Sequence, residues 1–490
     1  MFRKNFIILM LLLAVITSDA LAQFNQVLYF MNLPQRTSLN PALRPTSRFN
    51  VGLPVVSDIS IFLDNNFLNF SDLFLNGVIS DSTFSFLEPG DHLNAFLEGL
   101  NNKNSVEPQA AVQLFGLGFT VGKDLYITFD LTERFDANIV FPGDLLKLGI
   151  NGSEGFMGQR IDLSSLRADF KYYHEIGLGI SKNFTERLRI GLKGKVLLGV
   201  TAGYLDNNGF GLRINDDYTH SLDADMTFNI SGPVNVYPVG GGPLESLTFD
   251  DARFDSSEGI IAFLTNAGNP GLGFDIGAEY RISERISVSA AVTDLGFIRW
   301  KTDRAQLKTS SQFTFSGMTM QDVYEDNVTF NDLLSTTFDS LKSKIYITDG
   351  APFSTFLPVG LTVAGSYSPV KVFSVGLLSH TRFIGKQVHE ALTISANVNL
   401  GNALSATATY TAANQKYDNL GAGLSLRAGY LQLYTLIDNV PFNWSKAHSG
   451  ERSYSLPESW NTVHIRLGLN LTFGNKIKER PLTLTQPDVD

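Results

Sequence analysis

One stretch of the chain decides the fold class: Gly271-Leu-Gly-Phe-Asp-Ile-Gly-Ala-Glu-Tyr-Arg-Ile-Ser-Glu-Arg-Ile-Ser-Val-Ser-Ala-Ala-Val-Thr-Asp-Leu-Gly-Phe-Ile-Arg-Trp300. From Leu272 to Ile282, apolar residues occupy every second position, and glycines and charged residues occupy the positions between them. This alternation predicts a strand with one apolar and one polar face. After a short turn the alternation resumes at Ile286, which predicts a β-hairpin.

The two faces of this hairpin indicate where it resides. The polar face carries full charges and glycines, as the water-filled lumen of a barrel does, and the apolar face is long enough to cross a bilayer. A soluble β-sandwich shows the same alternation and is the alternative. We interpret the hairpin as two strands of an all-β, transmembrane outer-membrane antiparallel β-barrel.

The same alternation recurs along the chain and ends in a regular strand, 462–473, whose apolar face finishes at Phe473. Six short inner turns after the first strand, Phe49 to Phe62, predict fourteen strands if the hairpin Gly209 to Ile230 stands above the membrane. Sixteen strands follow if that hairpin is part of the wall. We expect fourteen.

Short motifs in the hairpin also carry a family resemblance. Asn269-Pro270-Gly271 and Asp294-Leu295-Gly296-Phe297 resemble an uncharacterised family of Bacteroidota outer-membrane barrels, which is similar to the FadL-type long-chain fatty-acid channels. The resemblance implies a location in the outer membrane and a channel for hydrophobic small molecules. It also implies an N-terminal hatch inside the barrel, which maps onto Asn40, Pro41 and Ala42.

The N-terminus reads as an export signal. Arg3 and Lys4 precede an apolar run, and Ala20-Leu21-Ala22 is a small-residue cleavage pattern. We therefore expect a signal peptide over 1–22, cleaved after Ala22. Since the next residue is Gln23 and the chain has no cysteine, a lipoprotein anchor is not expected.

Composition agrees with a barrel. With 38 basic and 48 acidic residues the formal charge is −10, which argues against nucleic acid as a partner. Beyond the signal, no apolar run is long enough for a spanning helix, so a membrane location requires a barrel. The 43 glycines and 37 phenylalanines suit many strands with aromatic girdles.

The predicted organisation has four parts: the signal peptide 1–22, a hatch segment 23–48, the barrel 49–473 and a periplasmic tail 474–490. Prolines break regular structure in 23–48, and Asn40-Pro41 favours a compact turn. The alternative for this segment is a simple tether before the first strand. Long insertions with helix-like patterns predict outer loops; these patterns cover Phe67–Asn76, Asp91–Leu100 and Asp332–Ser343, and 301–352 departs from strict alternation. Phe473 is the expected assembly signal.

Charged residues on the polar faces predict the lumen wall. They form either a ligand-contacting pathway or, as we favour, a paired filling of the barrel interior. The residues are Lys171, Glu175, Lys193, Lys195, Asp275 and Glu279. Asp294, Leu295 and Gly296 are the candidate for a lateral opening, since a glycine there favours a bulge that breaks the ladder; a simple bend at the rim is the alternative.

No motif for a hydrolase, a zinc protease or a nucleotide-binding loop is present, so we expect no enzyme, catalytic residue, metal or cofactor. Three functions stay open. The first is a FadL-like channel whose partners are outer-membrane lipid and a hydrophobic small molecule. The second is a barrel scaffold for type IX secretion or surface attachment, with secretion-system proteins as partners. The third and weakest is an enzyme on the barrel rim.

Overall fold

The computed structural model describes residues 25–68, 91–217, 219–237, 242–316, 344–348, 350–385, 387–401, 403–413, 416–441, 444–449, 452–457 and 461–474. The predicted signal peptide lies outside these residues, as do the tail beyond Gly474, most of the helix-like pattern Phe67–Asn76 and all of Asp332–Ser343.

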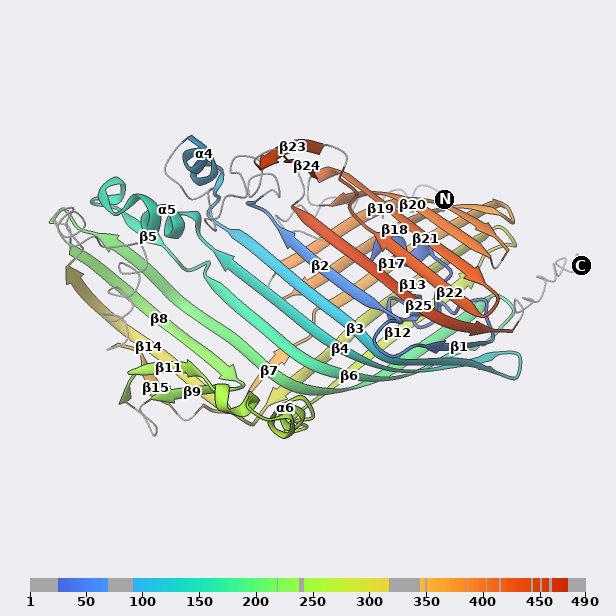
Figure 1. Ribbon diagram of the computed structural model, residues 1–490, viewed down its shortest axis with the longest axis horizontal. Helices are drawn as coiled ribbons and strands as arrows, with labels where there is room; N and C mark the ends of the chain where they lie inside the picture. Colours follow the sequence, from blue (N-terminus) through green and yellow to red (C-terminus); the bar gives the residue numbers. More distant parts are fainter. Residues whose placement is uncertain are drawn as a thin grey trace, which may run out of the picture.

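The described chain forms a closed antiparallel barrel whose wall has fourteen strand positions, here called staves (Figure 1). Two staves are each made of two strands in line, β1 with β2 and β16 with β17. The strands are β1 Phe49–Gly52, β2 Ile59–Asn65, β3 Asn104–Val121, β4 Leu125–Phe141, β6 Arg167–Asn183, β7 Leu188–Ile214, β12 Asn269–Arg281, β13 Ile286–Trp300, β16 Phe353–Phe356, β17 Val359–Val370, β18 Phe373–Ile384, β19 Gln387–Leu400, β20 Leu404–Ala413, β21 Lys416–Ala428, β22 Leu431–Ile437 and β25 Thr462–Phe473.

The last strand closes the barrel. β25 pairs with β22 on one side and with both halves of the first stave, β1 and β2, on the other. Among the described strands, this pairing leaves no sheet edge open around the wall, which is the arrangement that satisfies backbone groups in lipid. The prediction of a fourteen-stranded, all-β barrel is confirmed.

The sheet continues beyond the barrel on one side. The far half of β7 leaves β12 and pairs instead with β8 (Thr219–Ser231), which pairs along its length with β14 (Arg304–Ser316). The hairpin Gly209–Ile230 therefore stands outside the closed wall, and the sixteen-strand alternative is wrong. The stretch 301–352 was expected to be irregular, but it contains the strand β14. This strand forms because β8 supplies a partner for it.

The remaining elements after the first stave are short. They are β5 Arg160–Asp162, β9 Val234–Tyr237, β10 Gly242–Pro243, β11 Ser246–Phe249, β15 Tyr346–Thr348, β23 Trp444–Ser449, β24 Arg452–Pro457, α4 Asp91–Gly99, α5 Gly143–Asn151, α6 Ser257–Leu264, η3 Glu154–Phe156 and η4 Asp251–Phe254. The helix expected at Asp91–Leu100 is α4. Among the described residues, every helix is too short or too polar to span a membrane.

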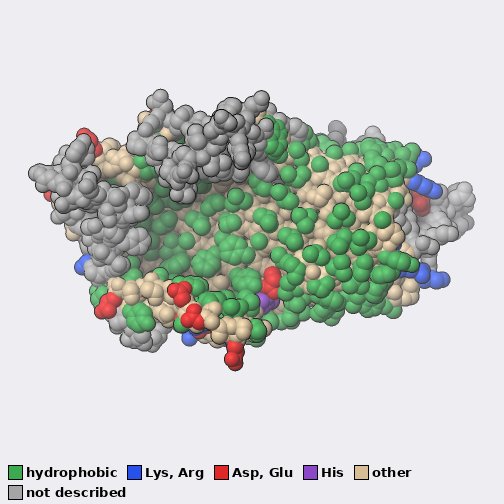
Figure 2. All heavy atoms as spheres, in the orientation of Figure 1, with side chains coloured by type: hydrophobic (Ala, Val, Ile, Leu, Met, Phe, Trp, Pro, Cys, Tyr) green, Lys and Arg blue, Asp and Glu red, His purple; other side chains and the backbone are tan. Residues whose placement is uncertain are grey.

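The outer face of the barrel is apolar. Leu178, Leu272 and Ile394 are each about 60% exposed, at 59%, 61% and 58%. Hydrophobic side chains cover the visible wall in Figure 2, and Lys and Arg side chains gather at its right-hand end. The polar residues of the same strands, such as Glu175 and Thr411, are fully buried inside. This inside-out pattern is typical of a barrel embedded in lipid.

The first stave is interrupted, although a continuous strand was expected from Phe49 to Phe62. Residues 53–58 interrupt the strand: Pro54 to Val56 are exposed, whereas Ser57 and Asp58 are buried in the lumen. Pro54 lacks the N–H that a ladder needs, and Val55 has a left-handed backbone (φ 67°). The inward turn is held by Tyr434, whose hydroxyl donates to the Ser57 carbonyl at 3.1 Å.

Candidate functional site

The segment from Asn25 to Arg48 lies inside the barrel (Figure 1, dark blue). It contains the short helix α2 (Gln26–Phe30) and the 3₁₀ turn η1 (Pro34–Ser38). Val27, Leu28 and Met31 are fully buried and pack with Tyr434 of the wall. The segment therefore fills part of the lumen, as a hatch does.

Asn40, Pro41 and Ala42 are all buried against the wall. The Ala42 amide donates to Asn40 Oδ1 at 2.9 Å, which is the turn that an Asx-Pro sequence favours. Gly191 of β7 and Gly277 of β12 leave room for this turn. A Cβ atom at either glycine would overlap it, at Pro41 for Gly191 and at Asn40 for Gly277.

Four of the six predicted lumen charges, namely Glu175, Lys193, Lys195 and Asp275, belong to one buried network. Lys195 Nζ lies 2.8 Å from Asp275 Oδ1, 2.5 Å from Asp294 Oδ1 and 3.8 Å from Glu175 Oε1. Lys193 forms ion pairs with Glu175 at 3.4 Å and with Asp130 at 2.8 Å. The mutual pairing agrees with the paired-filling interpretation more than with an open pathway.

The other two residues lie apart from that network. Glu279 pairs with Arg189 of the neighbouring strand. Lys171 lies on β6 opposite Asp136 of β4 and is half-buried. Arg134, which the sequence analysis did not single out, adds a third cation to the network by reaching Glu175 at 2.8 Å.

Asp294, Leu295 and Gly296 lie at a break in the wall. On one side of β13, Phe297 pairs with Phe356 of β16, but the next pair is Thr293 with Gly360 of β17. On its other side, the register with β12 shifts between Phe274 and Ile276, so that β13 carries an extra residue. The wall is thus irregular on both sides of the same three residues.

The bulge has a different cause from the one expected. The left-handed residue is Asp294 (φ 59°) and not Gly296. The Asp294 amide donates to the side chain of Asp275 at 2.7 Å, so the buried carboxylate replaces a lost ladder bond. Gly296 is required for space, because a Cβ there would overlap the backbone carbonyl of Leu272.

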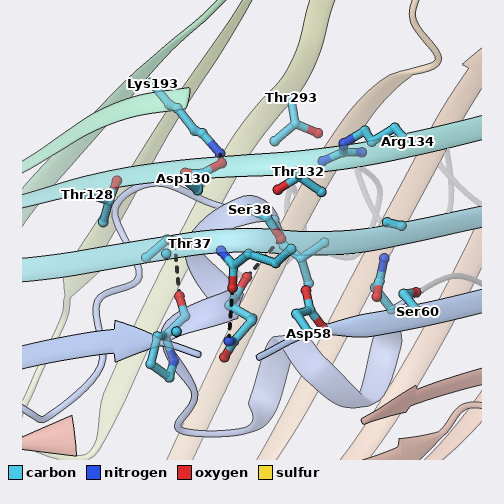
Figure 3. Close-up of a pocket in the computed structure, with 18 of the residues that line it drawn as sticks. Thr37, Ser38, Asp58, Ser60, Thr128, Asp130, Thr132, Arg134, Lys193 and Thr293 are labelled. Atoms are coloured by element: carbon cyan, nitrogen blue, oxygen red, sulfur yellow. Dashed lines mark hydrogen bonds and ion pairs between the residues drawn. The ribbon is translucent and has the colours of Figure 1, made fainter. Parts of the chain in front are cut away.

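A cavity inside the barrel and a groove outside it lie on the two sides of this break. Inside, a cavity of about 110 Å³ extends to Thr293 (Figure 3) and to its neighbour Asp294. Outside, a groove on the lipid-facing wall is lined mainly by apolar residues and reaches Leu295 and Gly296; its other members include Leu178, Ile180, Leu272, Phe274, Phe297 and Phe356. The irregular segment of β13 is thus the partition between a polar cavity and an apolar groove.

Residues 41–438 match the model of a family of unknown function, DUF5723. The chain belongs to this family. A comparison with curated proteins gave no match.

Solved structures with a similar barrel include transporters. The Ralstonia pickettii toluene transporter TbuX is 12% identical, with 90% of this chain and 94% of that chain covered and a TM-score of 0.38. A Pseudomonas aeruginosa FadL homologue is 9% identical, with 91% and 95% covered and a TM-score of 0.39. The Pseudomonas putida toluene transporter TodX is 9% identical, with 92% and 95% covered and a TM-score of 0.36. Their ligands are properties of those proteins.

Several residues that join the N-terminal segment to the wall in this DUF5723 protein were not predicted from the sequence. Asp58 accepts from Arg466 Nε at 2.6 Å and from the Tyr434 hydroxyl at 2.7 Å, and Arg466 also donates to Asn25 at 2.8 Å. These residues come from the two ends of the chain. Only the polar parity of Arg466 in the last strand signalled that it faces the lumen.

Proposed function

We propose that this protein is an outer-membrane channel for hydrophobic small molecules, and that the ligand passes between the lumen and the bilayer through the break in the wall at Asp294–Gly296. The observation that carries the proposal is that the lumen cavity and the apolar groove lie on opposite faces of this one irregular segment.

The charges of the lumen favour a sideways path. An apolar molecule that continued along the axis would meet Lys193, Lys195 and their carboxylate partners, and then the N-terminal segment. Leaving apolar surface in such a polar environment costs about 25 cal/mol per Å². The groove offers apolar residues at the height of the break, so it supports exit into lipid.

The segment 25–48 acts as the hatch in this proposal. Its turn at Asn40-Pro41-Ala42 occupies the space above the two wall glycines, and its helix packs on Tyr434. A hatch of this kind closes the lumen to water-soluble molecules while leaving the lateral path in place.

The test is uptake by intact cells. Cells that express the protein should accumulate a radiolabelled long-chain fatty acid or toluene faster than matched cells that carry the empty vector. Mass spectrometry of the purified protein should also find a bound apolar molecule. Uptake equal to the vector control for both probes, with no bound molecule, would contradict the channel.

The sheet extension favours a second candidate. β7, β8 and β14 continue past the closed wall and present a platform outside it (Figure 1). A scaffold for secretion or surface attachment uses such a surface. If uptake fails and affinity purification from the native envelope yields a stoichiometric protein partner, the scaffold replaces the channel.

A further inference from the structure

Three polar side chains that lie far apart in the sequence form a hydrogen-bonded chain inside the barrel. Ser60 Oγ of β2 lies 3.1 Å from Nε2 of His464 on β25. The other ring nitrogen, Nδ1, is bonded to Oδ2 of Asp438, which directly follows β22. All three residues are buried, with Ser60 at 5%, His464 at 0% and Asp438 at 1% exposure.

The direction of these bonds follows from the donors available. The Asn25 amide also approaches Nδ1 of His464, at 3.4 Å, but the carboxylate of Asp438 lies much closer to that nitrogen. Because an ionised carboxylate only accepts, we assign the proton of His464 to Nδ1, which donates it to Asp438. Nε2 then has a lone pair directed at the Ser60 hydroxyl. This is the order of a hydroxyl nucleophile, a base and an orienting acid that activates serine in acyl transfer.

The acid and the base are held in place by further contacts. The Val27 amide donates to Oδ1 of Asp438 at 2.7 Å, which leaves Oδ2 for the histidine. The Phe62 ring meets the His464 ring edge to face, with centroids 5.8 Å apart. The imidazole therefore has little freedom to turn away from Ser60.

Ser60 also lines the lumen cavity of about 110 Å³ (Figure 3). Its register partner on β25 is Arg466, which lines the same cavity. The Arg466 guanidinium is paired with Asp58, which lines the cavity as well, so the ion pair closes this side of the cavity next to the serine strand. A cavity of this size holds several water molecules, so it admits a short acyl group rather than a long chain.

We propose that Ser60 is a nucleophile that accepts the acyl group of short-chain esters, with His464 as its base and Asp438 as the positioning residue. Ser60 Oγ attacks the ester carbonyl carbon as its proton moves to His464 Nε2. The tetrahedral intermediate expels the alcohol oxygen, which takes that proton. A water molecule then gives a proton to Nε2 and attacks the acyl-serine, and the free acid leaves as Ser60 regains its proton.

This activity is separate from lateral passage, because the three residues lie on β2, β25 and the end of β22, and the wall break lies on β13. A competing explanation is that the same chain of bonds only fastens the N-terminal segment through Val27. The two explanations differ in whether the serine reacts.

The test uses the full-length protein folded in detergent micelles. Diisopropyl fluorophosphate is a small serine-directed probe, and p-nitrophenyl acetate is a short ester with a coloured product. We expect a covalent adduct on Ser60, located by peptide mass spectrometry, and release of p-nitrophenol. Ser60→Ala should abolish both signals, and His464→Gln or Asp438→Asn should lower the adduct rate by about a hundredfold or more.

The matched control is Ser425→Ala. Ser425 is also a buried lumen serine (3% exposed), but its hydroxyl accepts from Gln432 at 3.1 Å. Its removal should leave adduct formation unchanged. Heat-modified migration on SDS gels shows whether each variant is folded. If the His464 and Asp438 variants do not fold, the comparison of adduct formation between the unmodified protein and Ser60→Ala decides whether Ser60 reacts. No adduct on Ser60, or an equal adduct rate in folded His464→Gln, overturns the proposal in favour of the fastening role.

Discussion

Gly191 and Gly277 are register partners on β7 and β12, and together they leave the space that Asn40 and Pro41 occupy. The wall and the N-terminal segment are therefore fitted to each other at a point where neither strand has a side chain. Strand glycines are normally a weakness, and here they allow a second backbone to approach closely.

Substituting Gly277 by valine should loosen the N-terminal segment. The new side chain overlaps Asn40, and such overpacking costs about 1–3 kcal/mol. We expect larger single-channel conductance in planar bilayers than for the unmodified protein. Gly365→Val is the control, because a Cβ at Gly365 meets nothing within 4 Å and this residue lies outside the groove. Equal conductance for all three proteins would show that this contact does not hold the segment.

Lys195→Met should destabilise the barrel strongly. Lys195 is the common partner of Asp275 and Asp294 and its side chain is 1% exposed. Removing it leaves the buried Asp275 and the partly buried Asp294 without their lysine, at a cost of about 3–5 kcal/mol. Urea unfolding in micelles measures the change. Adding Asp294→Asn to Lys195→Met should restore part of the loss.

Lys171→Met is the control for that prediction. Lys171 is half-buried and lies outside the network. Its substitution should change the free energy of unfolding by about 1 kcal/mol or less. A loss as large as that for Lys195→Met would mean that the network has no special role.

Phe473→Asp should lower the amount of protein in the outer membrane. Phe473 ends the closing strand, pairs with Phe49 and stacks on Tyr430 with ring centroids 4.9 Å apart. Deleting 476–490 should leave the level near normal, because the tail follows the last strand. Immunoblots of membrane fractions measure both. Equal levels for the two variants would remove Phe473 as the assembly signal.

The fold was largely predictable from the sequence because strand alternation is a local signal. The hairpin Gly271–Trp300 has the predicted faces and turn, and Asp275 and Lys195 face the lumen as their parity requires. The break in the first stave was not predicted, since Ser57 and Asp58 turn inward through contacts with Tyr434 and Arg466, which lie 377 and 408 residues away in the sequence.

The sites were less predictable than the wall. Asp294–Gly296 was singled out for its glycine, yet the bulge depends on the left-handed Asp294 and on the side chain of Asp275, a partner on another strand. Ser60, His464 and Asp438 carry no spacing signal, because Ser60 meets His464 only through closure of the barrel, and Asp438 meets it only through the pairing of β22 with β25. Contacts made by closure have no local pattern to detect.

The lateral path is tested most directly by filling the groove from outside. Gly194 lines the groove on the lipid-facing side with open space around it, so Gly194→Phe places a ring there without backbone strain. Gly365→Phe is the matched control, because Gly365 also has open space around it but lies on β17 outside the groove. Both variants should reach the membrane at normal levels.

The decisive measurement is the initial rate of uptake of a radiolabelled long-chain fatty acid and of toluene by cells expressing each form at equal levels. We expect Gly194→Phe to lower the uptake rate of the transported probe at least about tenfold, toward the vector background, and Gly365→Phe to match the unmodified protein. Uptake by Gly194→Phe at the unmodified rate would contradict passage through the wall at Asp294–Gly296.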